Sequence, residues 1–405
     1  MKRKGAFLLL LMTMVVLLSS CWSKKELTDL AIVAAMGIDK TKDGRYHITL
    51  QIINPGNVAG GIQGGTQGPP ITIYSASGDN LVEASRQASS RISRRLYYAH
   101  TNLVVVGEKL AREEGVNTLV DAMDRDPEFR NTTTMVIANH STAADLVKTL
   151  TPVDKIPANK VLKTLEFTQR KWGDTVKLSL QEVMKGLQSP GEETVLAGFR
   201  LIGNHQQGQT LENLQESAPE STLQASGLAI LRKGKLIDWL YEDTARGTVW
   251  ILDKIQGTDI NIDWGRKKEA IAYQTVRQKT RISAQIKSGQ PHIYVHTRVE
   301  GDIGEIEVPV DINNPKVITK IEQSLKKEIK KEIKKAIKHS QKKKADIFGF
   351  GEVIQRSRPN QWEKIKTEWS NVYFPKLNVD ITVEVYVRRA GLRNKSFLSG
   401  VKENQ

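Results

Sequence analysis

The sequence Leu-Val-Val-Val at residues 103–106 decides the fold of the first half of this chain. Four consecutive apolar residues, three of them β-branched, are typical of a short buried strand. Helical spacing follows from about Glu108 to Asp124, and a second short apolar strand follows at 135–138. Short buried strands that alternate with helices predict an α/β domain.

The same alternation extends in both directions from this strand. Residues 71–74 read as a strand, and Asp79 can cap a helix after it. Ser141 can open another helix, and we place the α/β domain at 21–202. The apolar positions of the first helix recur at three- and four-residue spacing, and they are Leu81, Ala84, Ala88, Ile92 and Leu96.

The second half has an antiparallel character. A polar stretch at 203–222 predicts a linker, followed by an α+β domain at 223–392 and a tail at 393–405. The whole chain is therefore expected to be a multi-domain protein of mixed α/β and α+β structure. Its predicted strands are 228–231 and 236–239, joined at Lys233-Gly234, then 270–287, 292–299 and 377–387.

A long helix is predicted after Asn314-Pro315, a cap followed by a proline in the first turn. Residues 316–344 contain twelve lysines and three acidic residues. One interpretation is a solvated lysine face. The other is contact of Lys327, Lys331, Lys334 and Lys338 with anionic lipid or with a partner. The apolar stripe on the opposite side consists of Ile318, Ile321, Leu325, Ile329, Ile333, Ala336 and Ile337.

The first twenty residues read as a lipoprotein signal peptide. Three cations at positions 2–4 precede an apolar run from Ala6 to Leu18, and Ser19, Ser20 and Cys21 follow. The apolar run is shorter than the roughly 18 residues that a membrane-spanning helix needs. We therefore expect cleavage between Ser20 and Cys21 and a diacylglyceryl group, with acyl chains such as palmitate, on the Cys21 sulfur.

Composition agrees with export to the outer face of a membrane. Cys21 is the sole cysteine, so the fold contains no disulfide and needs a large apolar core. The formal net charge is +15. A chain outside the cytoplasm meets no genomic DNA, so no nucleic-acid partner is expected, and the positive charge favours anionic lipids, acidic wall polymers or an acidic protein.

Two smaller clusters contain residue types that can form binding sites. His292 and His296 lie four residues apart on one face of a predicted strand, but a metal needs further ligands and none lies in that strand. No metal or other cofactor is therefore predicted. A basic aromatic patch, which we read chiefly as the end of a helix, contains Arg91, Arg94, Arg95, Tyr97, Tyr98 and His100.

Several motifs together resemble the Ger(x)C lipoproteins, the C subunits of spore germination nutrient receptors. The resemblance covers nearly the whole chain after Cys21. The motifs are Cys21-Trp22, 26–31 (Glu-Leu-Thr-Asp-Leu-Ala), 36–40 (Met-Gly-Ile-Asp-Lys), 94–100 (Arg-Arg-Leu-Tyr-Tyr-Ala-His), 104–108 (Val-Val-Val-Gly-Glu), 125–128 (Arg-Asp-Pro-Glu) and 346–352 (Asp-Ile-Phe-Gly-Phe-Gly-Glu).

This resemblance implies a receptor component that assembles with a membrane-embedded A subunit and a transporter-like B subunit. It implies a location on the outer surface of the spore inner membrane, and it implies no enzymatic activity. It also implies three mixed α/β domains, which would place a further division near Asn313.

Two other classes of protein fit the sequence less well. A secreted hydrolase is disfavoured because the sequence has no Gly-x-Ser-x-Gly and no His-Glu-x-x-His, and because its one thiol is expected to carry lipid. A lipid-anchored solute-binding protein is the main alternative. It would have two similar α/β lobes around a cleft, whereas only the first half of this chain alternates in that way.

Overall fold

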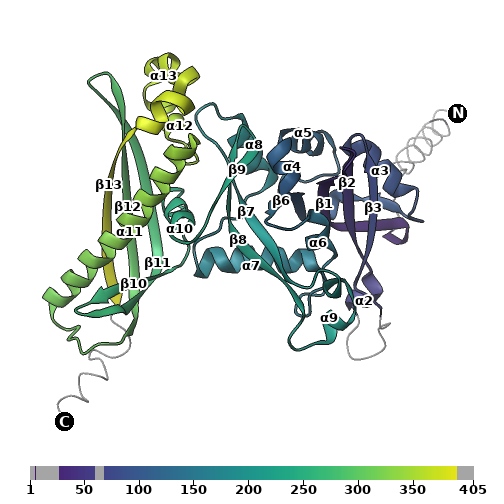
Figure 1. Cartoon of the computed structure of the whole chain (residues 1–405), viewed down its shortest axis with the longest axis horizontal. Helices are drawn as coiled ribbons and strands as arrows, with labels where there is room; N and C mark the ends of the chain where they lie inside the picture. The colour runs from purple at the N-terminus through teal and green to yellow at the C-terminus, as the bar shows by residue number, and fades with distance from the viewer. Residues whose placement is uncertain (1–4, 6–26, 60–67, 390–405) are drawn as a thin grey trace, which may run out of the picture.

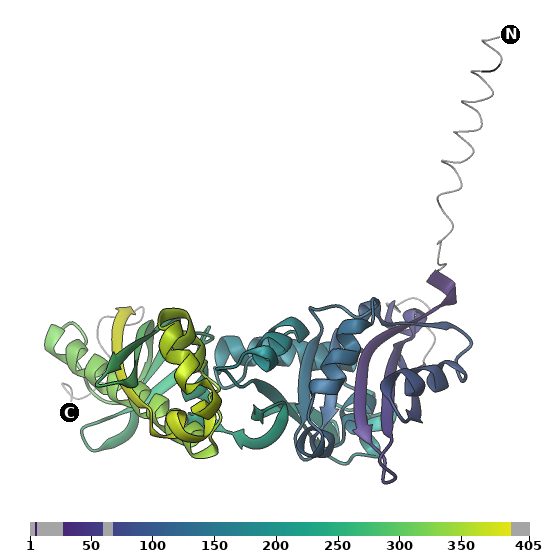
Figure 2. The ribbon, with the colours of Figure 1, turned by 90° about the horizontal axis from the view of Figure 1, so that it is seen from above.

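The computed structural model describes residues 5, 27–59 and 68–389, which form an elongated molecule with one β-sheet in each half (Figure 1). The mixed fold that the sequence predicts is confirmed. The two sheets differ in strand number and connectivity, so they are not the two similar lobes of the solute-binding alternative. Strand β1 begins at the end of the molecule that lies away from the second sheet (Figures 1 and 2).

The first sheet has nine strands in the described ranges, in the order β3-β2-β1-β5-β6-β7-β8-β9, with β4 beside β1. Its centre is parallel, since β5 pairs in that sense with both β1 and β6, and β6 with β7. Both edges are antiparallel. The strands are β1 (Leu30–Lys40), β2 (Tyr46–Ile53), β3 (Ile71–Gly78), β4 (Arg95–Tyr97), β5 (Leu103–Gly107), β6 (Thr134–Ala138), β7 (Val195–Gly203), β8 (Ser221–Arg232) and β9 (Lys235–Leu240).

Helices cover both faces of this sheet. Val104 and Val106 of β5 pack with α3, α4, α5 and α8, whereas Leu103 and Val105 pack with α6 and α7. The strand is therefore buried on both sides, as its sequence predicts. The helices are α3 (Leu81–Ser89), α4 (Glu108–Glu113), α5 (Asn117–Arg125), α6 (Ala143–Lys148), α7 (Pro157–Lys171) and α8 (Leu180–Gln188).

Two predicted helices are shorter than the sequence spacing indicates. The first ends at Ser89, is capped by Asn80 instead of Asp79, and leaves Leu96 to β4. The second is divided into α4 and α5 at Gly115, which has a φ of +88°. The next amide, that of Val116, donates to the carbonyl of Gly234 at 2.9 Å. The Val116 amide therefore bonds to the β8–β9 turn and makes no hydrogen bond that would continue the helix.

The predicted linker 203–222 includes the end of β7, the connection at 204–220 and the start of β8, and these two strands pair along most of their length. The connection contains α9 (Glu212–Gln215), and the buried Asn213 side chain donates to the carbonyls of Leu150 and Ser221. The predicted linker thus separates two paired strands of one sheet, and β8 and β9 belong to the first sheet instead of the second. The limits of the domains stay a prediction.

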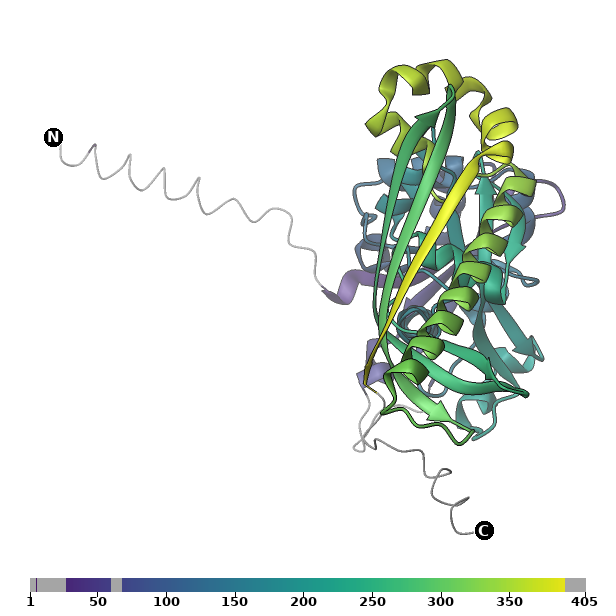
Figure 3. The same ribbon diagram turned by 90° about the vertical axis from the view of Figure 1, so that its left-hand side faces the viewer.

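The second sheet has the order β10-β11-β12-β13, and α11 lies across one face of it (Figure 3). Strands on both sides of Asn313 pair here, since β12 precedes and β13 follows that residue. The predicted helix and its apolar stripe are confirmed. The elements are α10 (Glu242–Ile251), β10 (Asp259–Trp264), β11 (Lys267–Lys287), β12 (Gln290–Ile306), α11 (Pro315–Lys343), α12 (Phe350–Ser357), α13 (Pro359–Ile365) and β13 (Asn378–Arg389).

One apolar core joins the two sheets. Leu228, Ile230 and Leu240 of the first sheet belong to the same buried cluster as Trp250 and the stripe of α11. A short helix, α2 (Pro55–Ala59), opens the stretch between β2 and β3, of which 60–67 lie outside the described residues. Within the described ranges, no helix combines the length and the hydropathy needed to cross a membrane.

Candidate functional site

A cavity of about 710 Å³ opens between α3, β4 and α5. It brings together two motifs that are distant in sequence, 94–100 and 125–128. Apolar side chains provide much of its lining, with charged groups from both motifs and from α3. The lining residues are Met36, Leu81, Val82, Ser85, Arg86, Ser89, Arg94, Arg95, Leu96, Tyr98, Ala122, Met123, Asp126, Pro127, Glu128 and Phe129.

An ion pair between the two motifs holds this cavity in shape. Arg95 Nη2 donates to Glu128 Oε1 at 2.9 Å, and the amide of Tyr98 donates to the other carboxylate oxygen at 3.4 Å. Asp126 fixes the turn, because its carboxylate accepts from the amide of Glu128 at 2.9 Å. The ring of Tyr98 stacks on Phe129 with centroids 5.3 Å apart. The motif residues therefore build the wall of the cavity.

The Tyr98 hydroxyl lies inside this wall. Burial raises the pKa of Tyr98 to about 12, and the nearby Ser85 opposes that shift. The hydroxyl makes no hydrogen bond of normal geometry with a described residue. Arg86 and Arg94 are exposed and have no carboxylate partner among the described residues. The interpretation of the basic aromatic patch as a helix end was incomplete, since Arg94, Arg95 and Tyr98 follow α3 and line the cavity, where Arg86 of α3 joins them.

Other motifs have structural roles at the carboxyl-terminal ends of β1 and β5, in the centre of the first sheet. Asp39 accepts from the amides of Ala143 and Ala144 at 3.0 and 2.9 Å, so it satisfies the amino-terminal end of α6. Gly107 lies against it, and a Cβ there would be 2.1 Å from Asp39 Oδ1. Burial raises the pKa of Asp39 despite those two amides. The motifs 36–40 and 104–108 thus fix the end of the parallel strands.

The motif 346–352 joins the two halves of the molecule. The fully buried Asp346 accepts from the amide of Gly351 at 2.8 Å and from Trp369 Nε1 at 3.0 Å. Its carbonyl accepts from the amide of Glu193 at 2.8 Å. A Cβ on Gly351 would lie 2.7 Å from the Gly191 backbone, so glycine permits the close approach of these two chain segments.

A pair of carboxyl groups lies at this junction. Burial, and then the neighbouring Glu352, raise the pKa of Glu192 to about 7. Burial likewise raises the pKa of Asp346 to about 7, although amides and an indole donate to it. The sequence does not reveal this pair, because Glu192 and Glu352 come from distant segments and only the fold makes them neighbours.

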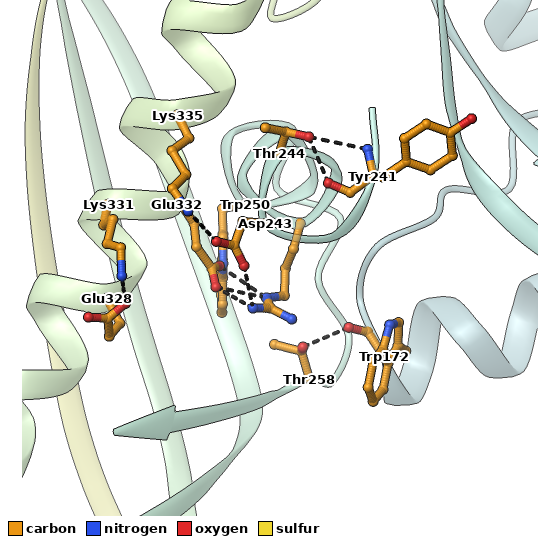
Figure 4. A network of polar contacts seen from close by, with 11 residues as sticks. Trp172, Tyr241, Asp243, Thr244, Trp250, Thr258, Glu328, Lys331, Glu332 and Lys335 are labelled. Carbon is orange, nitrogen blue, oxygen red and sulfur yellow. Dashed lines mark hydrogen bonds and ion pairs between the residues drawn. The ribbon is translucent and has the colours of Figure 1, made fainter. Parts of the chain in front are cut away.

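The four lysines singled out in the sequence are all exposed on α11, namely Lys327, Lys331, Lys334 and Lys338. Lys331 pairs with Glu328 at 2.8 Å, as Figure 4 also shows. Unlike the four lysines, Glu332 of the same helix is buried, and its carboxylate accepts a hydrogen bond from Trp250 Nε1 at 2.9 Å. The lysine face is therefore available to solvent or to a partner, and the choice between these stays open.

Other predicted sites divide into two groups. Ser20 and Cys21 lie outside the described residues, and the described chain resumes at Leu27, three residues before β1. His292 pairs with Asp380 at 2.8 Å and His296 with Glu384 at 3.3 Å, both across to β13. No group of three or more histidine, cysteine or acidic side chains suited to a metal occurs in the described part of the chain.

Comparison with known proteins agrees with the motifs. The model described as "Spore germination protein N-terminal domain" matches residues 23–201, and "Spore germination B3/ GerAC like, C-terminal" matches 226–391. Spore germination protein KC of Bacillus subtilis is 47% identical over 407 residues, covering 100% of both chains. Spore germination protein YndF of the same organism is 23% identical and covers 96% of this chain and 98% of its own.

A solved structure shows the same fold. The crystal structure of the GerBC protein superposes with a TM-score of 0.55 and 19% sequence identity, and it covers 87% of this chain and 96% of its own. The two family models, the relative of equal length and this fold lead to one conclusion. The chain belongs to the Ger(x)C family of spore germination proteins.

Proposed function

We propose that this chain is the lipid-anchored C subunit of a germinant receptor, held at the outer face of the spore inner membrane. It acts by binding the A and B subunits and not by catalysis, and it needs no cofactor. Family membership supports the spore germination role. The anchor, the partners and the location are proposed here.

One observation carries the assembly role. The first described element after Cys21 begins at Leu27, and β1 begins at Leu30 in the first sheet. An extended chain spans at most about 3.6 Å per residue, so the eight residues between Cys21 and β1 reach about 30 Å. A lipid on Cys21 would therefore hold the first sheet beside the bilayer, where membrane-embedded subunits lie.

Such tethering makes weak interfaces sufficient. Confinement raises the effective concentration of one partner near another, so contacts too weak in solution can be occupied at a membrane. The apolar core that the two sheets share supports this role, because it packs both halves of the chain together beside the proposed anchor.

The anchor is tested by the substitution Cys21→Ala in the full chain, followed by membrane fractionation of sporulating cells. We expect an uncleaved precursor or release from the normal anchor, because no other residue can form the thioether. Ser23→Ala is the matched control and should fractionate as the unsubstituted chain does. A Cys21→Ala chain that is processed and retained normally would refute the anchor.

A further inference from the structure

We infer that the cavity between α3, β4 and α5 binds an anionic phospholipid, with its phosphate on Arg86 and Arg94 and an acyl chain against the apolar wall. This inference rests on the proposed anchor for its location only. Four observations of the cavity carry it: its position, its unpaired cations, its apolar lining and its exposed rim.

The cavity lies next to the point where the chain enters the first sheet. Arg95 of β4 pairs in parallel register with Leu30, the first residue of β1. Figure 2 shows β1 starting at the end of the molecule that carries α3. Because β1 follows Cys21 by so few residues, a lipid on Cys21 places this cavity within reach of the same bilayer.

The charges at the cavity select an anion. Five charged side chains line it, and they are Arg86, Arg94, Arg95, Asp126 and Glu128. Arg95 is neutralised by Glu128, and Asp126 accepts from a backbone amide. Arg86 and Arg94 are left without a carboxylate partner among the described residues. A guanidinium presents several N–H groups in a plane and pairs well with a phosphate.

The apolar part selects a hydrocarbon chain. Met123 and Leu96 are buried in the wall, and Val82 stands at the rim with 58% of its surface exposed. The volume of about 710 Å³ lies in the usual range for ligand pockets, ~300–1,000 Å³. A free phosphate or a short anion would occupy the arginines and leave this wall and rim in water. A phospholipid satisfies both parts at once.

The experiment uses the full chain with a photoreactive benzophenone residue in place of Val82. Val276 is the matched control position, since it is 51% exposed and lies on β11 in the other half. Both chains, each with and without Cys21→Ala, are mixed with vesicles of phosphatidylglycerol and phosphatidylcholine and illuminated. Lipid adducts are then measured by mass spectrometry.

We expect phosphatidylglycerol adducts from position 82 and few from position 276, with or without Cys21. Arg86→Gln with Arg94→Gln should lower the adduct at position 82 by on the order of tenfold, because each arginine beside an anionic headgroup contributes to binding. The exposed pair Arg277→Gln with Arg281→Gln should leave it unchanged. Ala122→Trp should fill the cavity and also lower it.

Three outcomes would overturn the inference. Equal lipid adducts from positions 82 and 276 would show general proximity to the membrane and no binding in the cavity. Phosphatidylcholine adducts that equal those of phosphatidylglycerol would remove the role of the arginines. In spore membranes, adducts from position 82 to a protein in place of lipid would assign the cavity to a partner subunit. If the unsubstituted full chain were absent from the membrane fraction of cells, only the proposed anchor would be refuted. The vesicle experiment with the Cys21→Ala chain tests the cavity without the anchor.

Discussion

Arg246 and Glu332 form an ion pair that joins α10 to α11, in which Glu332 is buried and Arg246 half-buried. Arg246 Nε donates to Glu332 Oε2 at 3.0 Å, and Trp250 Nε1 donates to the same oxygen at 2.9 Å. Burial opposes the charge on Arg246, but Glu332 outweighs it and raises the pKa of Arg246. In Figure 4 Glu332 points toward Trp250, while Lys335 reaches Asp243 on α10. This network fixes the long helix against the centre of the molecule.

Glu332→Ala should strongly destabilise the chain, because it leaves the half-buried Arg246 guanidinium with only its longer ion pair to Asp243, at 3.6 Å, and leaves the buried Trp250 indole N–H without an acceptor. Removing one partner of a buried pair costs about 3–5 kcal/mol. Glu328→Ala, four residues earlier, is the control and should change the free energy of unfolding by less than about 0.5 kcal/mol, since its pair with Lys331 is exposed. Urea unfolding followed by circular dichroism measures both. Equal losses for the two variants would contradict the structural role of Glu332.

The two faces of α11 should separate by substitution. Replacing Lys327, Lys331, Lys334 and Lys338 by Gln should leave the melting temperature nearly unchanged, because exposed charges contribute only tenths of a kcal/mol each. Ile329→Ala should cost about 2–5 kcal/mol, since Ile329 is fully buried.

The same lysine variant tests whether the lysine face of α11 is only solvated or contacts anionic lipid. Binding to anionic vesicles at low salt, measured by co-sedimentation, should weaken if the face contacts lipid. Unchanged binding would leave the solvated face as the remaining interpretation. Arg86 and Arg94 stay intact in this variant, so the cavity and the helix are tested independently.

Local patterns in this sequence predict helices and strands well, but they predict poorly which other helices or strands each one packs against. The apolar run at 103–106 predicts β5 because burial on both faces needs apolar residues at every position. The stripe of α11 predicts its buried face for a similar reason. The prediction from spacing is wrong at Leu96. This residue continues the helical spacing of α3, but it lies in strand β4. Tertiary packing overrides the local pattern there.

The remaining errors come from contacts between distant segments. Gly115 divides a predicted helix because the Gly234 carbonyl, more than a hundred residues later, accepts from Val116. Strands β8 and β9 have an antiparallel pattern that does not say which sheet they join. The cavity is likewise built from motifs 94–100 and 125–128, which meet through contacts such as Arg95–Glu128 that only the fold provides.

The junction between the two halves should respond to pH. Burial and Glu352 raise the pKa of Glu192 from 4.5 to about 7, and burial raises that of Asp346 from 3.8 to about 7. The folded chain therefore keeps protons that the unfolded chain has lost between these values. Stability from these groups is fully present below about pH 4 and is lost as the pH rises toward 7.

Glu192→Gln removes one of these titrations. We expect the variant to be more stable than the unsubstituted chain at about pH 8, by on the order of 1 kcal/mol, and to lose less stability between about pH 5 and pH 8. The exposed Glu216→Gln is the control. Urea unfolding at both values of pH measures the effect. A Glu192→Gln chain with an unchanged pH profile would show that the carboxyl pair does not titrate in this range.

The last prediction concerns how the chain takes part in germination. If it acts by holding a receptor together, residues 22–405 alone should have no affinity for the nutrient, and they should be monomeric or weakly associating, because the tether normally supplies the local concentration. Calorimetry with the germinant and sedimentation of the purified chain measure these properties.

Deletion of the gene should abolish the response to the nutrients of that one receptor and leave other receptors unaffected. The Cys21→Ala gene should reproduce the deletion in part, since its product would lack the proposed anchor. Micromolar binding of a germinant by the isolated chain would replace the assembly role by direct sensing, and normal germination of the deletion strain, with no other receptor substituting, would contradict the assignment to a receptor.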